Sequence, residues 1–195
     1  MGTTRQYRMA ARGEAVEQTR ARILDAVGAI AFEDLELDPT LETVAARAGV
    51  SVQTVLRHYG TRAALLEAAA RGATAEVVAE RTPSSGDPDA ALAALVQHYE
   101  RRGPLVLVLL ARERTDPPIA AITESGRRLH REWVSDVFGG RLPADPAARE
   151  ALLDQLVVAT DVYAWKLLRG DRGLSPTVVR ERMRAMTDAL LRPSP

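Results

Sequence analysis

The chain has 195 residues, 46% of them hydrophobic and 27% charged, and its 26 basic and 26 acidic side chains give a formal net charge of zero. This composition is typical of a globular protein and excludes a disordered chain, while the absence of cysteine excludes disulfides, thiolate metal sites and a nucleophilic thiol. The longest apolar run, Leu105 to Ala111, is too short to span a bilayer, and no apolar segment follows the N-terminal arginines. We therefore expect a cytoplasmic protein without a membrane partner.

Helical periodicity runs along the whole sequence, whereas the alternation typical of a strand is missing, so we expect an all-α fold of about nine helices. In the first of them Ile23, Val27 and Ile30 share one face. The predicted helices cover residues 14–32, 41–48, 52–58, 62–81, 88–102, 105–113, 119–138, 147–169 and 176–191.

Short polar residues and glycines mark the ends of the early helices. Thr40, Ser51 and Thr61 are predicted N-caps, because a side-chain oxygen at that position accepts one of the free backbone N–H groups. Gly49 and Gly60 are predicted to end the two short helices, since glycine adopts the left-handed conformation at no steric cost.

Proline and glycine predict the breaks in the second part of the chain. Residues 83–88 form the clearest loop, in which Asp87 and Pro88 are typical of the start of a helix. Gly103–Pro104 is expected to interrupt the next helix. The short apolar helix that follows, residues 105–113, is expected to be buried on most sides.

The two short helices around Gly49 form a helix-turn-helix pattern. Such a unit needs a small residue where the helices cross, a glycine at the turn and an apolar residue after it, and Ala45, Gly49 and Val50 meet these needs. Val55 completes the small core. The second helix is then held rigidly, and its polar residues can face the major groove of DNA. These residues are Gln53, Thr54, Arg57 and His58.

The charges are unevenly distributed although they sum to zero. Residues 43–62 carry Arg47, Arg57 and Arg62 without an acid, whereas acids gather at residues 33–38. Such local basic stretches suit a protein that touches phosphate with one end only. Three further arginines of the N-terminus form either a solvated tail or an arm for the minor groove, namely Arg5, Arg8 and Arg12.

The order of residues around this motif is distinctive. The stretch from Thr40 to Ser51 reads TLETVAARAGVS, and Arg22–Ala26 reads RILDA. The pattern continues through Thr54, Tyr59, Thr61, Arg62, Leu65 and Leu66. This order of residues resembles the TetR family of transcriptional repressors. The resemblance implies a DNA-binding domain of three helices, a homodimer built from the last two helices and a ligand cavity in the C-terminal body. We accordingly expect an N-terminal arm and helix-turn-helix domain over residues 1–60 and a ligand-binding and dimerisation domain over residues 61–195.

The resemblance also assigns the DNA contacts. The recognition-helix positions are Val52, Gln53, Thr54, Leu56, Arg57 and His58. Thr43 is expected to hold phosphate at the start of the preceding helix, and Arg62 stands where the family usually has a phosphate-binding lysine. Leu56 departs from the family, since many members have a tyrosine there, and leucine either touches a thymine methyl or packs inward. Tyr59 is expected to be a core residue that joins the recognition helix to the fourth helix.

A ligand pocket in the body should be mostly apolar with a few polar groups. The candidates are His98, Tyr99, Arg112, His130, Trp133, Thr160, Asp161 and Tyr163. Trp133 and Tyr163 are also compatible with plain core positions. Asp161 interrupts an apolar run and is expected to pair with an arginine or face solvent, with a cationic ligand as the third alternative.

The last two helices carry apolar residues that can pair two subunits. The predicted seam consists of Val157, Val158, Leu167, Leu168, Val178, Met183, Met186, Leu190 and Leu191. Pairing would place two recognition helices in successive major grooves of a palindromic site.

The function expected from these features is that of a ligand-responsive transcriptional regulator, a repressor that leaves its double-stranded DNA operator when a small-molecule effector binds. A helical protein-interaction adaptor and a DNA-binding regulator without a ligand are the alternatives. The histidines His58, His98 and His130 have no metal-binding spacing, and there is no phosphate-binding loop or nucleophile elbow. We therefore expect no enzymatic activity, no metal and no cofactor.

Overall fold

The computed structural model describes residues 3–81 and 87–192, and all regular structure within these ranges is helical, which confirms the expected all-α fold. The helices are α1 (Thr3–Glu33), α2 (Leu41–Ala48), α3 (Val52–Tyr59), α4 (Arg62–Arg81), α5 (Pro88–Arg112), α6 (Pro117–Phe138), α7 (Pro146–Thr160), α8 (Val162–Trp165) and α9 (Pro176–Leu190), with a 3-10 turn η1 (Gly139–Arg141) and a π-helical segment η2 (Lys166–Asp171). The chain divides into two compact units, Met1–Ala75 and Glu76–Pro195. The division falls within α4 and not at residue 60, so α4 begins in unit 1 and ends in unit 2.

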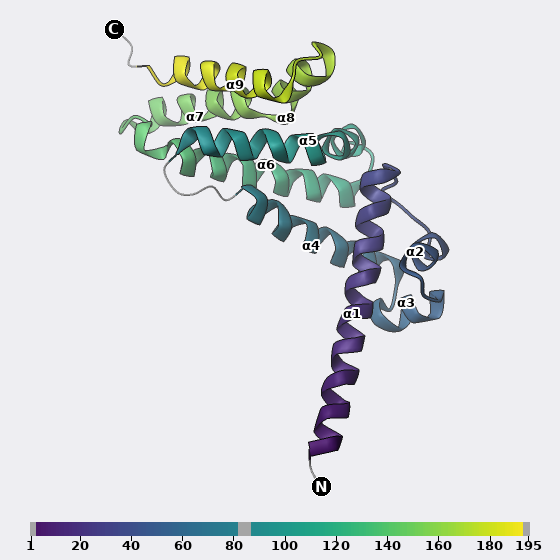
Figure 1. Ribbon diagram of the computed structural model, residues 1–195. Helices are drawn as coiled ribbons and strands as arrows, with labels where there is room; N and C mark the ends of the chain where they lie inside the picture. Colours follow the sequence, from purple (N-terminus) through teal and green to yellow (C-terminus); the bar gives the residue numbers. More distant parts are fainter. Residues whose placement is uncertain (1–2, 82–86, 193–195) are drawn as a thin grey trace. The chain divides into compact units, whose positions relative to one another are not determined.

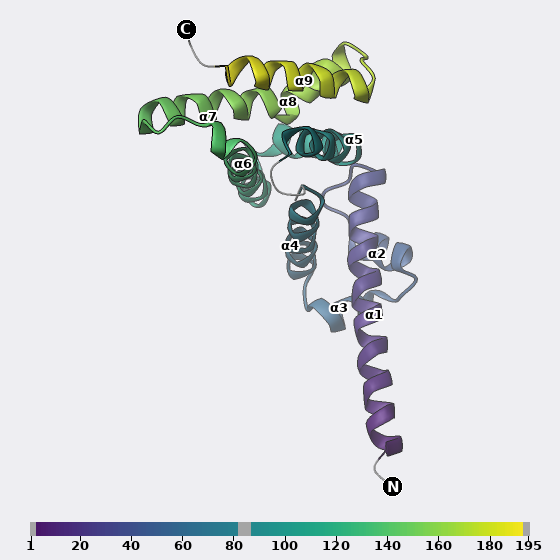
Figure 2. The same ribbon diagram turned by 60° about the vertical axis from the view of Figure 1, so that its left-hand side comes forward.

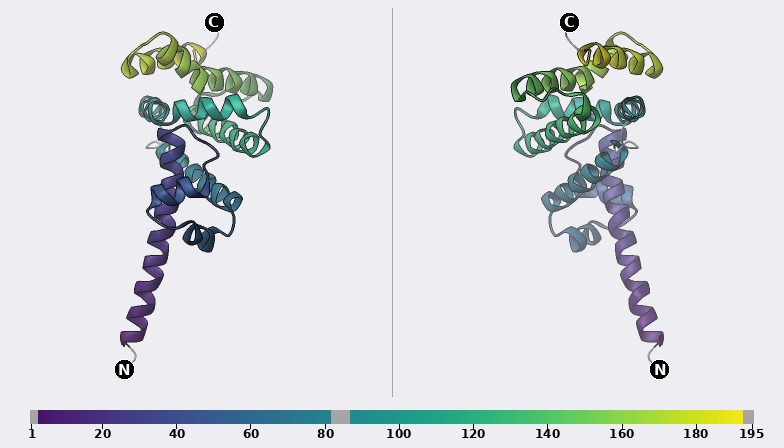
Figure 3. Two further views of the ribbon diagram at one scale, coloured as in Figure 1. Left: turned by 90° about the vertical axis from the view of Figure 1, so that its right-hand side faces the viewer. Right: turned by 90° about the vertical axis from the view of Figure 1, so that its left-hand side faces the viewer.

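Unit 1 is built on α1, with α2 and α3 packed beside its C-terminal half (Figure 3). Its core is apolar and takes residues from α1 to α4, namely Ile23, Ala26, Val27, Ile30, Val44, Ala45, Ala48, Val55 and Leu65. Helix α1 is longer than predicted, since it begins at Thr3 and not at Glu14. The side chains of Arg5, Arg8 and Arg12 lie outside the described part of the chain.

In unit 2, α5 packs on α6 and α9, and α7 lies beside α9 (Figure 1). Its core contains residues of α5 to α9, with Leu92, Leu95, Val134, Leu156, Val179 and Met183 fully buried. Helices α7 and α9 lie side by side at one edge of this unit and cross the direction of α5 and α6 (Figure 2). No helix in the described ranges is both long and apolar enough to cross a membrane.

Two predicted helix boundaries in unit 2 are wrong. Helix α5 runs without interruption through Gly103–Pro104. A proline removes one backbone N–H and crowds the preceding residue, but glycine before it has no Cβ to clash, so the helix continues. The predicted helix over residues 147–169 is broken at Asp161, whose backbone is extended with φ −69° and ψ 156°. The Asp161 carboxylate accepts a hydrogen bond from the Tyr163 N–H at 2.8 Å and thereby caps α8.

Candidate functional site

The turn between α2 and α3 has the geometry that the sequence predicts. Gly49 is left-handed with φ 66° and ψ 38°, and its N–H donates to the Ala46 carbonyl at 3.2 Å. The Val50 N–H donates to the Ala45 carbonyl at 3.0 Å, which completes the C-cap of α2. One residue further, the Ser51 hydroxyl caps α3 by accepting from the backbone N–H three residues on, at 3.1 Å. The turn therefore holds α3 in a single orientation against α2.

Helix α3 presents a defined face to solvent because its inner face is anchored by Val55, which is fully buried. Gln53, Leu56 and Arg57 are exposed, and the remaining predicted contact residues of α3 are half-buried, namely Val52, Thr54 and His58. Leu56 is 38% exposed, so of the two alternatives for this position the structure excludes inward packing. An exposed leucine between polar residues is available to a thymine methyl group.

Tyr59 packs against the core of unit 1 and bonds the end of α3 to α1. Its hydroxyl donates to the Arg20 carbonyl at 3.0 Å, and the Arg20 guanidinium lies 5.2 Å from the centre of the Tyr59 ring. Burial raises the pKa of the Tyr59 hydroxyl. Tyr59 is thus a positioning residue for α3.

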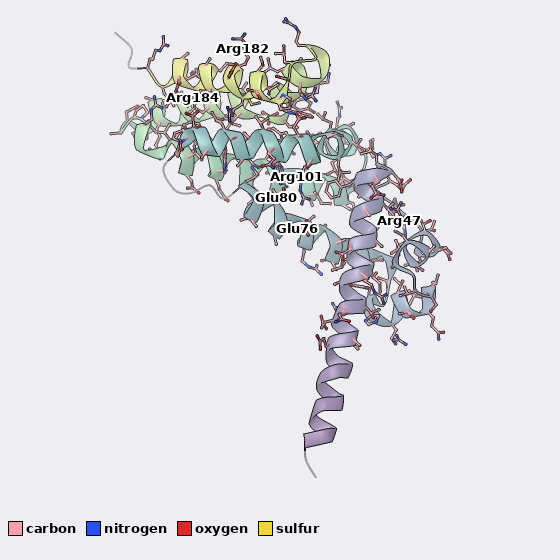
Figure 4. All side chains as sticks on the ribbon, viewed as in Figure 1. Arg47, Glu76, Glu80, Arg101, Arg182 and Arg184 are labelled. Carbon is pink, nitrogen blue, oxygen red and sulfur yellow. The ribbon has the colours of Figure 1, made fainter. Side chains whose placement is uncertain are left out.

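Two of the arginines in the basic stretch are engaged within the protein. Arg47 donates to Glu33 at 2.5 Å and to Asp34 at 3.0 Å, so α2 is bound to the end of α1 (Figure 4). Arg62 donates from Nε to the Pro39 carbonyl at 2.8 Å and from Nη2 to the Asp38 carbonyl at 2.6 Å. Arg62 therefore secures the loop before α2, a role that the resemblance does not assign to it.

The predicted phosphate contact at the start of α2 is accessible. Thr43 is exposed, and its hydroxyl lies 3.0 Å from the hydroxyl of Thr40. The Thr40 hydroxyl accepts the Thr43 N–H at 3.1 Å and is the N-cap of α2, as predicted. Thr43 and Arg57 are both exposed and therefore accessible to a polyanion.

Unit 2 contains a chain of buried polar groups that links four helices. Arg81 at the end of α4 donates from Nη2 to Nδ1 of His130 on α6, at 2.5 Å. The other ring nitrogen of His130 lies 3.1 Å from the hydroxyl of Thr160 on α7, which itself donates to the Leu156 carbonyl at 2.7 Å. Tyr99 on α5 donates to the Thr160 carbonyl at 3.0 Å.

These contacts determine the protonation of His130. Arginine only donates, so Nδ1 of His130 must be the acceptor, and the single ring proton is on Nε2 and donates to the Thr160 hydroxyl. Burial first, and the positive charge of Arg81 second, lower the pKa of His130 to about 3, so the ring is neutral. Burial also raises the pKa of Tyr99.

A second polar cluster ties the end of α4 to α5. Glu80 accepts from Nε and Nη2 of Arg102, at 2.9 and 2.8 Å, and from Nδ1 of His98 at 2.9 Å. Glu76 accepts from Arg102 at 2.9 Å, and Arg101 adds an ion pair to Glu80 at 3.4 Å (Figure 4). These donors, Arg102 first, lower the pKa of Glu80 to about 2. Burial lowers the pKa of His98 to about 4.

The structure brings together five of the eight predicted pocket residues in one buried region, namely His98, Tyr99, His130, Trp133 and Thr160. Arg112 and Tyr163 are exposed at the surface instead, because Arg112 ends α5 and Tyr163 faces outward from α8. Asp161 is half-buried and caps α8, which explains the acid in an apolar run.

Sequence reasoning missed the α4 residues of this region. Arg81 follows Val77 by four residues and therefore continues the apolar stripe of α4, so a charge on that stripe was the signal. Glu80 and Arg102 have no comparable signal, since the spacing between them is set by the packing of α4 on α5.

The residues of the predicted dimer seam fall into three groups according to their burial. Met183 and Leu191 belong to the core of unit 2, so they are unavailable to a partner chain. The half-buried members are Val157, Leu168, Val178 and Leu190. The exposed members are Val158, Leu167 and Met186, and exposed Tyr163 lies on α8 between them in sequence.

Known proteins resemble this chain in sequence and in fold. No protein-family model matches it. The HTH-type transcriptional repressor LfrR of Mycolicibacterium smegmatis is 38% identical over 117 residues, which cover 56% of this chain and 60% of that repressor. The match therefore spans about three fifths of the relative's length.

Solved structures share most of the fold. A transcriptional regulator of Rhodococcus sp. Rha1 has a TM-score of 0.66 at 23% identity, covering 88% of this chain and 95% of that one. A putative transcriptional regulator of Pseudomonas aeruginosa PAO1 has a TM-score of 0.64 at 20% identity, covering 90% and 91%. A TetR transcription regulator of Haloarcula marismortui has a TM-score of 0.60 at 17% identity, covering 89% and 98%. The resemblance to TetR regulators stated from the sequence is thus confirmed, and this chain has the all-helical fold of a TetR transcription regulator.

Proposed function

We propose that this protein is a transcriptional regulator of the TetR type, a repressor that binds a palindromic DNA operator as a homodimer and leaves it when a small-molecule effector binds. The observation that carries the proposal is the face of α3. Val55 is fully buried beneath it, while Gln53, Leu56 and Arg57 are exposed on a helix that its turn holds rigidly. Helices fixed in this way read base edges in the major groove.

Each exposed residue of this face suits a particular DNA contact. Arg57 can bond guanine or phosphate, Gln53 can bond adenine and Leu56 can cover a thymine methyl group. Thr43 adds a hydroxyl for phosphate at the start of α2. Val52, Thr54 and His58 are half-buried and serve as secondary contacts at the margin of the face. Arg62 contributes mainly by holding the loop before α2.

A second copy of the chain is the proposed partner of the edge formed by α7 and α9. Val158 is 70% exposed and Leu167 56% exposed, which is unusual for aliphatic side chains on packed helices. Tyr163 and Met186 extend the apolar surface. Pairing would set the recognition helices roughly 34–36 Å apart, the repeat of the major groove.

The effector is proposed to act through α4. This helix begins in unit 1, where Leu65 is part of the core, and ends in unit 2, where Glu80 and Arg81 bond to α5 and α6. A ligand that changes these bonds favours one position of α4 over another. The DNA-binding form then becomes less populated, which lowers operator affinity without a new contact to DNA.

The test is selection of bound fragments from a random duplex library by the purified full chain, followed by affinity measurements of the winner against salt. We expect a palindromic consensus with two half-sites about one helical turn apart and an affinity that falls steeply with salt. Absence of enrichment, or binding that is indifferent to sequence, would reject the proposal and leave the helix-turn-helix as a fold element.

A further inference from the structure

Arg81 is a buried cation whose hydrogen bonding is incomplete. The residue is only 7% exposed, and its Nε is a buried side-chain atom without a hydrogen-bond partner. In the described ranges its ion-pair partner is missing as well, since the groups that touch it are the neutral His130 ring and the Trp133 ring, whose centre lies 5.2 Å away. A guanidinium removed from water without a counter-charge lowers the stability of the fold.

The neighbouring arginine shows that the fold is able to supply such a counter-charge. Arg102 is buried to a similar degree, yet it binds Glu80 through two nitrogens and Glu76 through one. Asp161 acts on Arg81 through its charge and not through a hydrogen bond, and its carboxylate caps α8. Of these two buried arginines, Arg81 is therefore the one to which the described residues bond no carboxylate directly.

We propose that the effector is an organic carboxylate, whose anionic oxygen accepts a hydrogen bond from Nε of Arg81. This inference rests on the proposed function, since it names the ligand of the body that the proposed function requires. Trp133, which also donates to the Arg81 carbonyl at 3.0 Å, offers an aromatic surface beside the guanidinium for the apolar part of the ligand.

The same charge excludes other ligand classes. A cationic ligand would meet the positive charge of Arg81 in a region of low dielectric, where like charges repel strongly. A neutral ligand would leave the guanidinium without a counter-charge. The sequence had left a cation at Asp161 as one alternative, and the position of Arg81 argues against it.

The location of Arg81 also gives the ligand a mechanical consequence. The residue is the last of α4, and its Nη2 is the donor that orients His130 on α6. A carboxylate on Nε gives the guanidinium a charged partner. The hydrogen bonding of Arg81 is then shared between His130 and the ligand. Binding therefore acts directly on the helix that continues into unit 1.

The test compares carboxylates with their neutral amides on the full chain in the absence of DNA. Octanoate and benzoate are expected to raise the melting temperature, because they bind the native state only, whereas octanamide and benzamide are not. Arg81→Met removes the charge and keeps the length, and it should abolish the shift. Arg112→Met is the matched control, since Arg112 is exposed at the end of α5, and it should retain the shift.

Titration calorimetry at 25 °C gives the second readout. Arg81→Met should lower carboxylate affinity about 30-fold or more, the effect of removing one partner of a buried charge pair. If Arg81→Met does not fold, Arg81→Lys takes its place and should bind with intermediate affinity. An unchanged carboxylate affinity in the variant that folds would overturn the proposal. Equal shifts of the melting temperature by the amides or by inorganic phosphate would do the same. The proposal would also be overturned if the carboxylates did not shift the melting temperature of the parent.

The two proposals can fail separately. The anion measurements contain no DNA, so a negative result there leaves the operator selection intact. Conversely, if selection from the duplex library fails, the proposed regulatory function is rejected. A measured carboxylate affinity would then stand as a result that this function does not explain. Release of a selected operator by octanoate in the parent, but not in Arg81→Met, would support both.

Discussion

Arg81 donates its Nη2 hydrogen to Nδ1 of His130 across 2.5 Å, and this single contact determines the tautomer of the histidine. With Nδ1 occupied as an acceptor, Nε2 carries the proton and orients the Thr160 hydroxyl. The polar chain from α4 to α7 therefore depends on a neutral imidazole in the interior of unit 2. The electrostatic state of this region is coupled to the stability of the fold.

The free energy of unfolding is expected to fall as the pH is lowered below about 6.5, the ordinary histidine pKa. His98 and His130 have folded pKa values of about 4 and 3, lowered mainly by burial, so between those values and 6.5 the unfolded chain binds more protons. Stability therefore rises with pH in this window and is lost on acidification. Urea denaturation at pH 7, 6 and 5 measures it.

His130→Gln separates this effect from general acid sensitivity. Glutamine can accept from Arg81 and donate to Thr160, so the variant should fold at pH 7, as circular dichroism would show. The slope of stability against pH should be smaller than in the parent. An equal slope in parent and variant would show that His130 does not contribute to acid unfolding.

Arg57→Ala is expected to weaken operator binding by about 1–3 kcal/mol and to reduce the salt dependence by about one counterion, since Arg57 is the exposed arginine of α3. Fluorescence anisotropy with the selected operator measures both. Arg128→Ala, which removes a surface arginine of unit 2, is the control and should bind like the parent. Parent-like affinity in Arg57→Ala would remove α3 from the DNA interface.

Arg62→Ala is expected to destabilise the protein by about 1–2 kcal/mol, because its two hydrogen bonds to the Pro39 and Asp38 carbonyls are lost. If Arg62 acted on phosphate alone, stability would be unchanged and only DNA affinity would fall. Urea denaturation and operator binding on the same variant distinguish the two roles. Arg57→Ala serves as the reciprocal case, with weakened binding and unchanged stability.

Val158→Asp combined with Leu167→Asp is expected to give monomers, because both side chains are exposed on the edge proposed to pair two chains. Burial of either carboxylate in an apolar interface is costly. Sedimentation velocity of the double variant and parent provides the measurement. Ile122→Asp, an exposed apolar residue of α6, should remain dimeric. A dimeric double variant would place the interface elsewhere.

Gly103→Ala is expected to destabilise unit 2 by about 1–3 kcal/mol through overpacking. A Cβ at this position would lie 2.5 Å from Cζ3 of Trp165, inside the closest approach of real side chains. Gly126→Ala on α6 is the matched control, since its Cβ would meet nothing within 4 Å. Helix propensity alone should make the control about 0.5–1 kcal/mol more stable. Chemical denaturation measures the free energy of unfolding of both variants. Equal changes in the two would contradict the expected clash with Trp165.

The sequence by itself determined the local features of unit 1. The caps at Thr40 and Ser51, the left-handed Gly49 and the buried Val55 all follow from residue chemistry within a few positions, because helix ends and short turns are governed by nearby backbone groups. The exposed face of α3 then follows from helical periodicity, which places Gln53 and Arg57 on the side opposite Val55.

Only the tertiary structure decided which charges and polar groups meet. Arg47 and Glu33 are 14 residues apart, and Arg81 and His130 are 49 apart, so no periodicity of one helix relates them. Packing also decided that Met183 is core while Val158 is surface, although both lie on apolar helical stripes. The same holds for the break at Asp161, where the hydrogen bond to the Tyr163 N–H starts a new helix within an apolar run. Local propensity cannot resolve such choices, because they depend on the free energy of burial against distant helices.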